Sequence, residues 1–293
     1  MRVDLLAGTI YAPRMAIQER KALAPTILVF DSGVGGLTVF SELRKARPDA
    51  RFVYAADDAG FPYGRLTEDE LVARIVAVMD RLIARHVPDL VVVACNTAST
   101  AVLPPLRQRF PIPFVGTVPA VKPAAALSRS RRIAVLATPA TVARDYTRDL
   151  VHSYANACAV TLVGSRRLAA LAEAELTGAP GSDGDILAEI APCFTRGEGG
   201  PTDVVVLACT HYPILLPRFE RLAPWPVTWV DPAPAIARRV VQLLGTPPGS
   251  GPGEGEALAV FTGGAGVTGP LRTALAARGL SRIAVEPMPL AQA

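Results

Sequence analysis

The stretch Asp89-Leu-Val-Val-Val-Ala-Cys95-Asn-Thr97 decides the fold, because Asp203-Val-Val-Val-Leu-Ala-Cys209-Thr-His211 repeats its pattern further along the chain. Each stretch has an aspartate, a continuous apolar run, an alanine and a cysteine. Such runs are typical of parallel strands that are buried on both faces. A helical segment with a proline follows each copy (Leu103-Pro104 and Leu216-Pro217). We infer an internal duplication of one α/β unit and expect two similar lobes that face each other.

Strands and helices alternate along the rest of the chain. Short apolar runs predict strands at 26–30, 51–56, 133–138, 159–163, 258–262 and 283–285, and helices are predicted at 66–86, 183–193 and 271–278. Thr67 and Glu70 have the spacing of a capping box in the first of these helices. The alternation predicts two pseudo-symmetric, doubly wound α/β lobes with mainly parallel sheets. Their ligand is expected beyond the carboxyl ends of the strands, between the lobes.

The predicted lobes are discontinuous in the sequence. Residues 26–120 together with 231–293 are expected to form the first lobe, and residues 121–230 the second. Residues 1–25 are interpreted as an N-terminal extension, and the glycine- and proline-rich stretch Gly245–Glu256 as a surface linker.

Composition excludes several classes of protein. The 293 residues are 50% hydrophobic and 19% charged, which suits a globular protein with a buried core. The apolar runs are much shorter than the about 20 residues of a membrane-spanning helix. Residues 1–25 contain no apolar segment typical of a secretion signal. We therefore expect a cytoplasmic protein without a membrane partner.

The positive charge does not indicate a nucleic-acid partner. The formal net charge is +4, but Lys21, Lys45 and Lys122 are the only lysines among the 30 basic residues. The arginines are scattered and form no stripe interleaved with aromatic residues, which a nucleic-acid groove would need. No nucleic-acid partner is predicted.

Four cysteines occur, at positions 95, 158, 193 and 209. They form no C-x-x-C pair and no Cys/His cluster with zinc-ligand spacing, so no metal site is predicted. A free cysteine ordinarily packs as a small apolar residue, which is our interpretation of Cys158 and Cys193. Cys95 and Cys209 lie at equivalent strand ends, and each precedes hydrogen-bonding side chains. We interpret these two thiols as groups that take part in a reaction.

Two opposed thiols suit one reaction in particular. A thiol at a helix start has its pKa lowered from about 8.5 toward neutrality, so both protonation states are accessible. One thiol can then remove a proton from a carbon while the other returns a proton to the opposite face, as in a two-base racemase. An ionised Asp31 would raise the pKa of a nearby thiol, and a protonated His211 would lower it. We therefore expect the two thiols to have different pKa values. The other two histidines, His86 and His152, are interpreted as surface residues.

The stretch Asp31-Ser-Gly-Val-Gly-Gly-Leu37 follows a predicted strand and opens a helix. Its glycines would let the backbone approach a ligand closely, and a helix N-terminus favours an anion. The spacing matches neither a Walker phosphate loop nor the dinucleotide-binding motif. From these residues alone, an ordinary strand-to-helix turn is an equal alternative.

Five motifs occur in order: Asp31-Ser-Gly-Val-Gly-Gly36, Phe61-Pro-Tyr-Gly64, Ala94-Cys-Asn-Thr-Ala-Ser99, Val118-Pro-Ala-Val-Lys-Pro123 and Cys209-Thr-His-Tyr-Pro213. Together they resemble the glutamate racemases of the aspartate/glutamate racemase superfamily, from about Thr26 to the C-terminus. The resemblance implies two pseudo-symmetric α/β lobes with the site between them. It also implies interconversion of L- and D-glutamate without a cofactor, supplying D-glutamate for bacterial peptidoglycan.

The resemblance further implies roles for individual residues. Cys95 would take the proton from the D-enantiomer and Cys209 from the L-enantiomer. Asp31 and His211 would assist them, and Glu173 is a candidate supporting acid. The residues that match the substrate contacts of the family are Asp31, Ser32, Tyr63, Gly64, Asn96, Thr97, Thr210 and His211.

One position departs from the family pattern. Many members have a basic residue two positions before the proline of Pro-Tyr-Gly, where this chain has Gly60. With its N-terminal extension, the chain resembles a branch of the family in which a cell-wall precursor nucleotide is an activator. Such a nucleotide is therefore a candidate partner. A homodimer is also expected, because dimers are common in the family.

Several alternatives remain open at this point. A racemase of the same superfamily that acts on aspartate or a hydantoin would share the cysteines and differ in the pocket near Tyr63. A Cys-His hydrolase with Cys209 as nucleophile and His211 as base would leave Cys95 unexplained. A two-lobed binding protein would leave both thiols unexplained. A pyridoxal phosphate enzyme would need a Schiff-base lysine, for which only Lys122, at a predicted helix start, is suitably placed.

Overall fold

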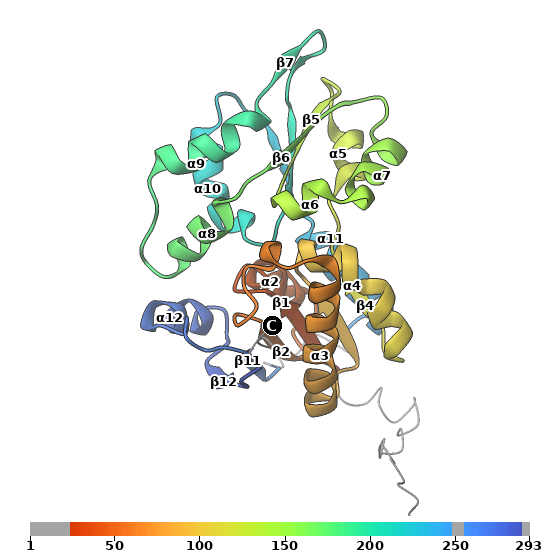
Figure 1. Cartoon of the computed structure of the whole chain (residues 1–293), viewed down its shortest axis with the longest axis vertical. Coiled ribbons are helices and arrows are strands. Elements are labelled where there is room, and N and C mark those ends of the chain that lie inside the picture. Colours follow the sequence, from red (N-terminus) through yellow and green to blue (C-terminus); the bar gives the residue numbers. More distant parts are fainter. Residues whose placement is uncertain (1–23, 248–254, 289–293) are drawn as a thin grey trace, which may run out of the picture.

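The computed structural model describes residues 24–247 and 255–288. The first of its two lobes, the lower one in Figure 1, contains a six-stranded parallel sheet. The order across this sheet is β12 (Arg282–Val285), β11 (Ala257–Phe261), β2 (Arg51–Ala56), β1 (Thr26–Asp31), β3 (Leu90–Val93) and β4 (Phe114–Gly116).

The second lobe, the upper one in Figure 1, contains a four-stranded parallel sheet. Its order is β10 (Thr228–Val230), β9 (Val204–Ala208), β5 (Arg132–Ala137) and β6 (Ala159–Gly164). A short antiparallel ribbon of β7 (Arg196–Gly197) and β8 (Gly200–Pro201) lies at the end of this lobe that points away from the first lobe (Figure 1).

The two sheets share one strand order. The first contains the run β2-β1-β3-β4 and the second the run β6-β5-β9-β10, so β3 corresponds to β9. Cys95 follows the end of β3 and Cys209 follows the end of β9. The predicted duplication of one α/β unit is confirmed by this order, and the two cysteines occupy equivalent places in it.

Helices cover both faces of the first sheet, because successive strand side chains point to opposite faces. Ile27 and Val29 of β1 belong to an apolar cluster with α2 (Leu37–Ala46), α11 (Ala233–Leu244) and α12 (Gly269–Ala276). Leu28 and Phe30 belong to a second cluster with α3 (Glu68–His86) and α4 (Asn96–Arg109).

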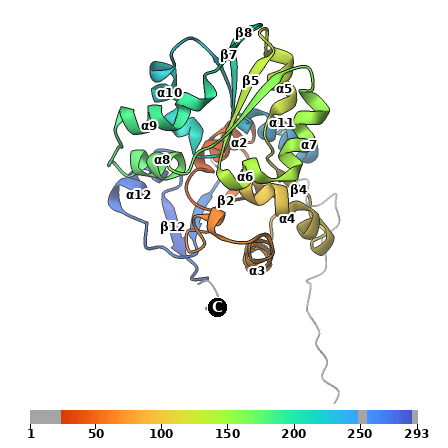
Figure 2. The same ribbon diagram turned by 45° about the horizontal axis from the view of Figure 1, so that its top comes forward.

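The second sheet is covered in the same way. One of its clusters joins α8 (Leu168–Leu176), α9 (Asp183–Ile190) and α10 (Leu216–Leu222), and the other joins α5 (Val121–Leu127) and α7 (Asp145–Tyr154). Both lobes are therefore doubly wound, as predicted. Figure 2 shows where they meet: α6 (Pro139–Ala143) contacts α4, and α8 contacts α12.

The predicted strands lie at or within about two residues of their expected positions. The helix predicted from Leu66 begins at Glu68, because Thr67 is its N-cap: the Thr67 hydroxyl accepts a hydrogen bond from the Glu70 amide, 3.4 Å away. The helix predicted to run to Cys193 ends at Ile190 and continues as a 3₁₀ turn, Ala191–Cys193, that contains a proline.

The interpretation of His86 as a surface residue is wrong. Only 11% of its side chain is exposed, and its Nε2 lies 3.2 Å from the Glu286 carboxylate. The interpretation of His152 is confirmed, because that residue is exposed. The packing interpretation holds for both remaining cysteines: Cys193 is buried in one apolar cluster of the second lobe, and Cys158 is half-buried against the other.

Two expectations about the course of the chain fall partly outside the described residues. The N-terminal extension expected at 1–25 lies there except for its last two residues, and so do residues 248–254 of the expected linker. The lobe boundaries after residue 120 and before residue 231 stay predictions. None of the helices in the described ranges is long and apolar enough to cross a membrane.

Candidate active site

A cavity of about 560 Å³ lies between the two lobes, at the carboxyl ends of the strands. Its lining includes nine of the residues expected in the site: Ser32, Tyr63, Gly64, Cys95, Asn96, Thr97, Cys209, Thr210 and His211. The other two, Asp31 and Glu173, contact Thr210 and His211 directly behind the lining. The fold thus brings together side chains from both lobes that are far apart in the sequence.

Cys95 reaches the cavity from the first lobe. It is the N-cap of α4, only 6% exposed, and its Sγ lies 3.7 Å from the Ser32 hydroxyl. Burial and, after it, the nearby Asp31 carboxylate raise the pKa of this thiol to about 12. This agrees with the expected effect of Asp31 and overrides the lowering expected from a helix start. In the ligand-free enzyme Cys95 is therefore a neutral thiol.

Asp31 ends β1 and is completely buried. Its Oδ2 accepts hydrogen bonds from the backbone amides of Gly33 and Gly36, at 3.2 and 3.1 Å. Its Oδ1 accepts one from the Thr210 hydroxyl of the other lobe, at 3.2 Å. These donors compensate for the burial of the carboxylate and hold it beside the Cys95 thiol.

Cys209 reaches the cavity from the second lobe, where it follows β9 and is 7% exposed. The Nδ1 atom of His211 lies 3.8 Å from its Sγ. On the other side of the ring, Nε2 lies 3.0 Å from the Glu173 carboxylate, which α8 supplies. The chain Cys209–His211–Glu173 is therefore built entirely within the second lobe.

His211 carries a perturbed pKa. Burial disfavours the charged imidazole, but the hydrogen bonds to Cys209 and Glu173 prevail and raise the pKa of His211 well above its ordinary value of 6.5. The ring is thus a cation beside Cys209, while the Cys95 side of the cavity has a carboxylate. The two thiols have unlike surroundings, as the sequence predicts.

The glycine-rich loop after β1 is the place where the lobes come closest. A β-carbon on Gly33 would lie 2.5 Å from the Glu173 carboxylate, and one on Gly35 would overlap the His211 imidazole. The Val34 amide donates to Glu173, at 3.4 Å. The glycines of this loop thus allow side chains of the other lobe to approach closely, while the expected approach to a ligand stays a prediction.

Several polar groups in the cavity remain available to a ligand. The amide oxygen of Asn96 is buried and has no hydrogen-bond partner among the described residues. The Thr97 hydroxyl lies 3.0 Å from that of Thr138. The Tyr63 hydroxyl donates to Asp57, at 2.6 Å, so this ring is held from behind, and Tyr63 lines the cavity together with Gly64.

Gly60, where the sequence departs from the family pattern, has a steric explanation. A β-carbon there would lie 2.8 Å from the Asp57 carboxylate and 2.9 Å from the Tyr63 ring. A longer side chain does not fit unless Asp57 or Tyr63 moves.

Sequence reasoning missed five polar or charged residues of the site. Thr138, Ser165, Arg65 and Arg166 line the cavity, and Asp57 supports Tyr63 from below. Thr138 and Ser165 follow directly after β5 and β6, and Asp57 follows β2. The rule that ligands bind beyond the carboxyl ends of parallel strands would have found these three.

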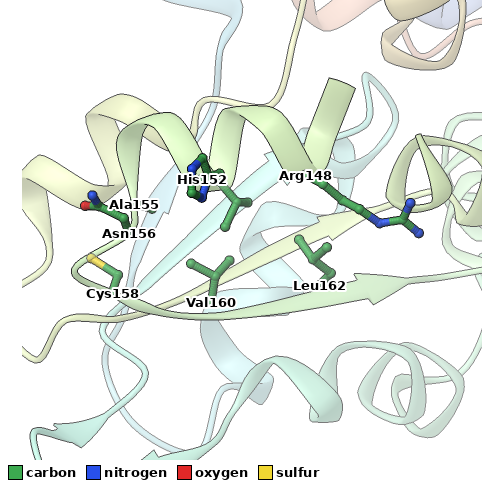
Figure 3. Close-up of a pocket in the computed structure, with 8 residues that line it drawn as sticks. Arg148, His152, Ala155, Asn156, Cys158, Val160 and Leu162 are labelled. Carbon is green, nitrogen blue, oxygen red and sulfur yellow. The ribbon is translucent and has the colours of Figure 1, made fainter. Parts of the chain in front are cut away.

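A second cavity lies on the outer side of the second lobe, between α7 and β6. Figure 3 shows Arg148, His152, Cys158 and Leu162 in its wall. It lacks the opposed polar groups of the first cavity. No cluster of His, Cys, Asp or Glu side chains suited to a metal ion occurs within residues 24–247 and 255–288.

Comparison with known proteins points to one family. A sequence model described as Asp/Glu/Hydantoin racemase matches residues 38–240. A glutamate racemase of Brucella anthropi is 59% identical over 219 residues, which cover 74% of this chain and 79% of that protein. A glutamate racemase of Sinorhizobium medicae is 55% identical over 239 residues, covering 81% and 88%.

The fold comparison agrees. The crystal structure of Escherichia coli glutamate racemase in complex with L-glutamate and the activator UDP-MurNAc-Ala superposes with a TM-score of 0.81 at 39% identity. The superposition covers 90% of this chain and 98% of that chain.

Proposed function

The chain belongs to the Asp/Glu/hydantoin racemase family, and we propose that it interconverts L- and D-glutamate by passing the α-proton between Cys95 and Cys209. Its relatives at 55% to 59% identity are glutamate racemases. The observation that carries the mechanism is the pair of cysteines at equivalent strand ends, which reach one cavity from opposite lobes.

The reaction needs a base on each face of the α-carbon. With D-glutamate bound, the Cys95 thiolate removes the α-proton and becomes a thiol, and the Cys209 thiol donates its proton to the opposite face of the carbanion. L-glutamate and the Cys209 thiolate result. The reverse reaction uses the same groups with their roles exchanged.

Substrate binding accounts for the activation of Cys95. Its high pKa in the free enzyme comes from burial and from the Asp31 carboxylate. The ammonium group of the amino acid is the natural partner of Asp31, and once bound it offsets that negative charge. Its own positive charge beside the sulfur then favours the thiolate, and the thiol proton passes to water as the substrate binds. The thiol is thus activated only when a substrate is present.

The second lobe supports Cys209 differently. The cationic His211 lies 3.8 Å from its sulfur and offers a hydrogen bond to the thiolate that forms when Cys209 accepts a proton. Glu173 fixes the orientation of the ring through Nε2 and keeps its charge compensated. Glu173 is a positioning residue, since it acts through His211.

The remaining groups hold the substrate. The backbone amides of Asn96, Thr97 and Thr210 and the side chains of Asn96 and Thr97 are donors for the α-carboxylate, on which negative charge develops as the proton leaves. Tyr63 and Gly64 lie further along the cavity and suit the side-chain carboxylate.

A single experiment tests this function. The purified protein is incubated with L-glutamate in D2O without added cofactor, and the products are analysed by NMR and by chiral chromatography. We expect deuterium at Cα together with the D-enantiomer. Exchange with aspartate and none with glutamate would move the substrate assignment within the family, and exchange with neither would refute the two-base reaction.

The D-glutamate formed supplies bacterial peptidoglycan synthesis, for which the chain acts in the cytoplasm as a homodimer. The Escherichia coli enzyme was crystallised with the activator UDP-MurNAc-Ala. By analogy, a nucleotide precursor of the cell wall activates this enzyme also. Assays with and without UDP-MurNAc-Ala test the activation, and size-exclusion chromatography with light scattering tests the dimer.

A further inference from the structure

Two arginines stand at the opening of the cavity, one from each lobe. Among the residues that line the cavity, only Gly64, Arg65, Pro139 and Arg166 are exposed, so these four form its opening. Arg65 ends the 3₁₀ turn Tyr63–Arg65 of the first lobe. Arg166 precedes α8 of the second lobe. A ligand that enters must pass between guanidinium groups of opposite lobes.

Neither guanidinium group takes part in a contact that stabilises the described part of the fold. Within residues 24–247 and 255–288, neither forms an ion pair or a hydrogen bond, whereas Arg167, the neighbour of Arg166, pairs with Asp185 at 2.7 Å. Two of the three acidic residues in the first turn of α3 have other contacts: Glu68 pairs with Arg144, and Glu70 accepts from the Thr67 amide at 2.8 Å. Both arginines therefore keep their full charge for the cavity opening.

No acidic residue balances this charge inside the cavity. The described residues in its lining include no aspartate or glutamate. Asp31 and Glu173 lie behind the lining, where the Asp31 carboxylate accepts from Thr210 and the Glu173 carboxylate lies 3.0 Å from His211 Nε2. The two guanidinium groups thus give the opening itself a positive charge that no carboxylate in the described lining offsets, and such a field attracts anions.

We propose that Arg65 and Arg166 form a capture pair that selects for net negative charge in the substrate. This inference rests on the proposed function, since glutamate carries two carboxylates and a net charge of −1. Arg65 directly follows Gly64, so its charge is placed where the side-chain carboxylate enters and leaves. The pair acts on binding and not on the proton transfer, which occurs deeper, at the two cysteines.

The test compares steady-state kinetics of the wild type with Arg65→Gln, Arg166→Gln and the double variant. Each single change is expected to raise KM for L-glutamate about two- to threefold, and the double change about fivefold or more, with kcat within about twofold of the wild type. Arg167→Gln is the matched control. It also removes one positive charge, but Arg167 is the next residue in the chain and its side chain does not line the cavity.

Ionic strength separates this effect from a structural one. Raising NaCl from about 20 mM to about 500 mM shortens the Debye length severalfold, so the wild-type KM is expected to rise several times over. In the double glutamine variant KM is expected to start high and to change little with salt. The Arg65→Lys/Arg166→Lys variant keeps both charges and is expected to retain the wild-type KM and salt dependence.

Three results would overturn the proposal: a double glutamine variant with wild-type KM and salt dependence, a lysine variant that behaves like the glutamine variant, or an Arg167→Gln variant with the same effect. A wild-type protein that does not racemise glutamate would instead refute the proposed function, so the two failures are distinguishable.

Discussion

Gly35 lies so close to His211 that a β-carbon on it would overlap the Nδ1 atom of the imidazole. These residues belong to different lobes and are far apart in the sequence. The contact holds the imidazole between the first lobe, on one side, and Cys209 and Glu173, on the other. The position of His211 relative to Cys209 therefore depends on the absence of a side chain at residue 35.

Gly35→Ala is predicted to displace the His211 ring from Cys209. A displacement of about 1 Å in a catalytic group costs about 100-fold in rate, so we expect a loss of that order in kcat. Racemisation assays in both directions measure it. Gly266→Ala is the control, because a β-carbon there meets no atom within 4 Å. Equal activity of the two variants would contradict the role assigned to this contact.

Cys95 is predicted to remain a thiol in the free enzyme well above neutral pH, because burial and then Asp31 raise its pKa to about 12. Its alkylation by iodoacetamide, followed by mass spectrometry of the peptide, should still be rising at pH 10. Asp31→Asn removes one of the two causes and should shift the profile to lower pH. A wild-type profile that is half-maximal near pH 8.5 would disagree with this prediction.

Glu173→Gln is predicted to destabilise the protein in a pH-dependent way. The pKa of His211 is raised on folding, so its protonation contributes stability that is fully present below the unfolded value of 6.5 and is lost as the pH rises through the folded value. The loss of free energy of unfolding in Glu173→Gln should be about 1–3 kcal/mol at pH 6 and smaller at alkaline pH.

Urea unfolding at several pH values measures this difference. Glu175→Gln is a suitable control, since Glu175 lies in the same helix but pairs with Arg218, which stays charged throughout. Its effect should not change with pH. A constant effect of Glu173→Gln as well would show that His211 is not the group concerned.

Asp57→Asn is predicted to weaken both the fold and substrate binding. The carboxylate is completely buried and accepts from Tyr63 at 2.6 Å, from Thr262 at 2.6 Å and from Arg74. Removing the charge takes the paired carboxylate away from the Arg74 guanidinium, which is only 9% exposed, and the loss of such a buried pair costs about 3–5 kcal/mol. KM should rise, because Tyr63 loses its support.

Asp80→Asn is the matched comparison for this prediction. Its ion pair with Arg109 is exposed on both sides, at 38% and 53%, and such pairs contribute about 1 kcal/mol or less. Denaturant unfolding and KM measurements on both variants test whether the buried pair contributes more than the exposed one. Equal losses of stability would mean that burial does not distinguish the two pairs.

The fold was predictable because its signals are local and repeated. The two Asp-to-Cys stretches predicted parallel strands, and the spacing of Thr67 and Glu70 predicted the start of α3. The burial of His86 was not predictable, since its partner Glu286 lies near the other end of the chain. Nothing in the residues around His86 signals that contact.

The site was predictable in part for the same reason. Cys95, Cys209 and His211 follow recognisable strands, whereas Arg65 and Arg166 are ordinary exposed arginines in the sequence. Their position at the cavity opening is evident only from the three-dimensional arrangement of the two lobes. The contact of Gly35 with His211 likewise exists only in three dimensions, so the sequence alone left the loop between two interpretations.

The unlike surroundings of the two sulfurs are subject to a thermodynamic limit. Enantiomers have equal free energies, so the equilibrium constant of the reaction is unity, and kcat/KM must be equal in the two directions. The unlike neighbours of the two sulfurs cannot bias the yield toward either hand. They can only redistribute kcat and KM between the directions in compensating amounts. In the proposed reaction, each of the two similar lobes supplies the proton acceptor for one face of the α-carbon. Differences between the lobes can therefore change kcat and KM, but they cannot change the final ratio of L- to D-glutamate.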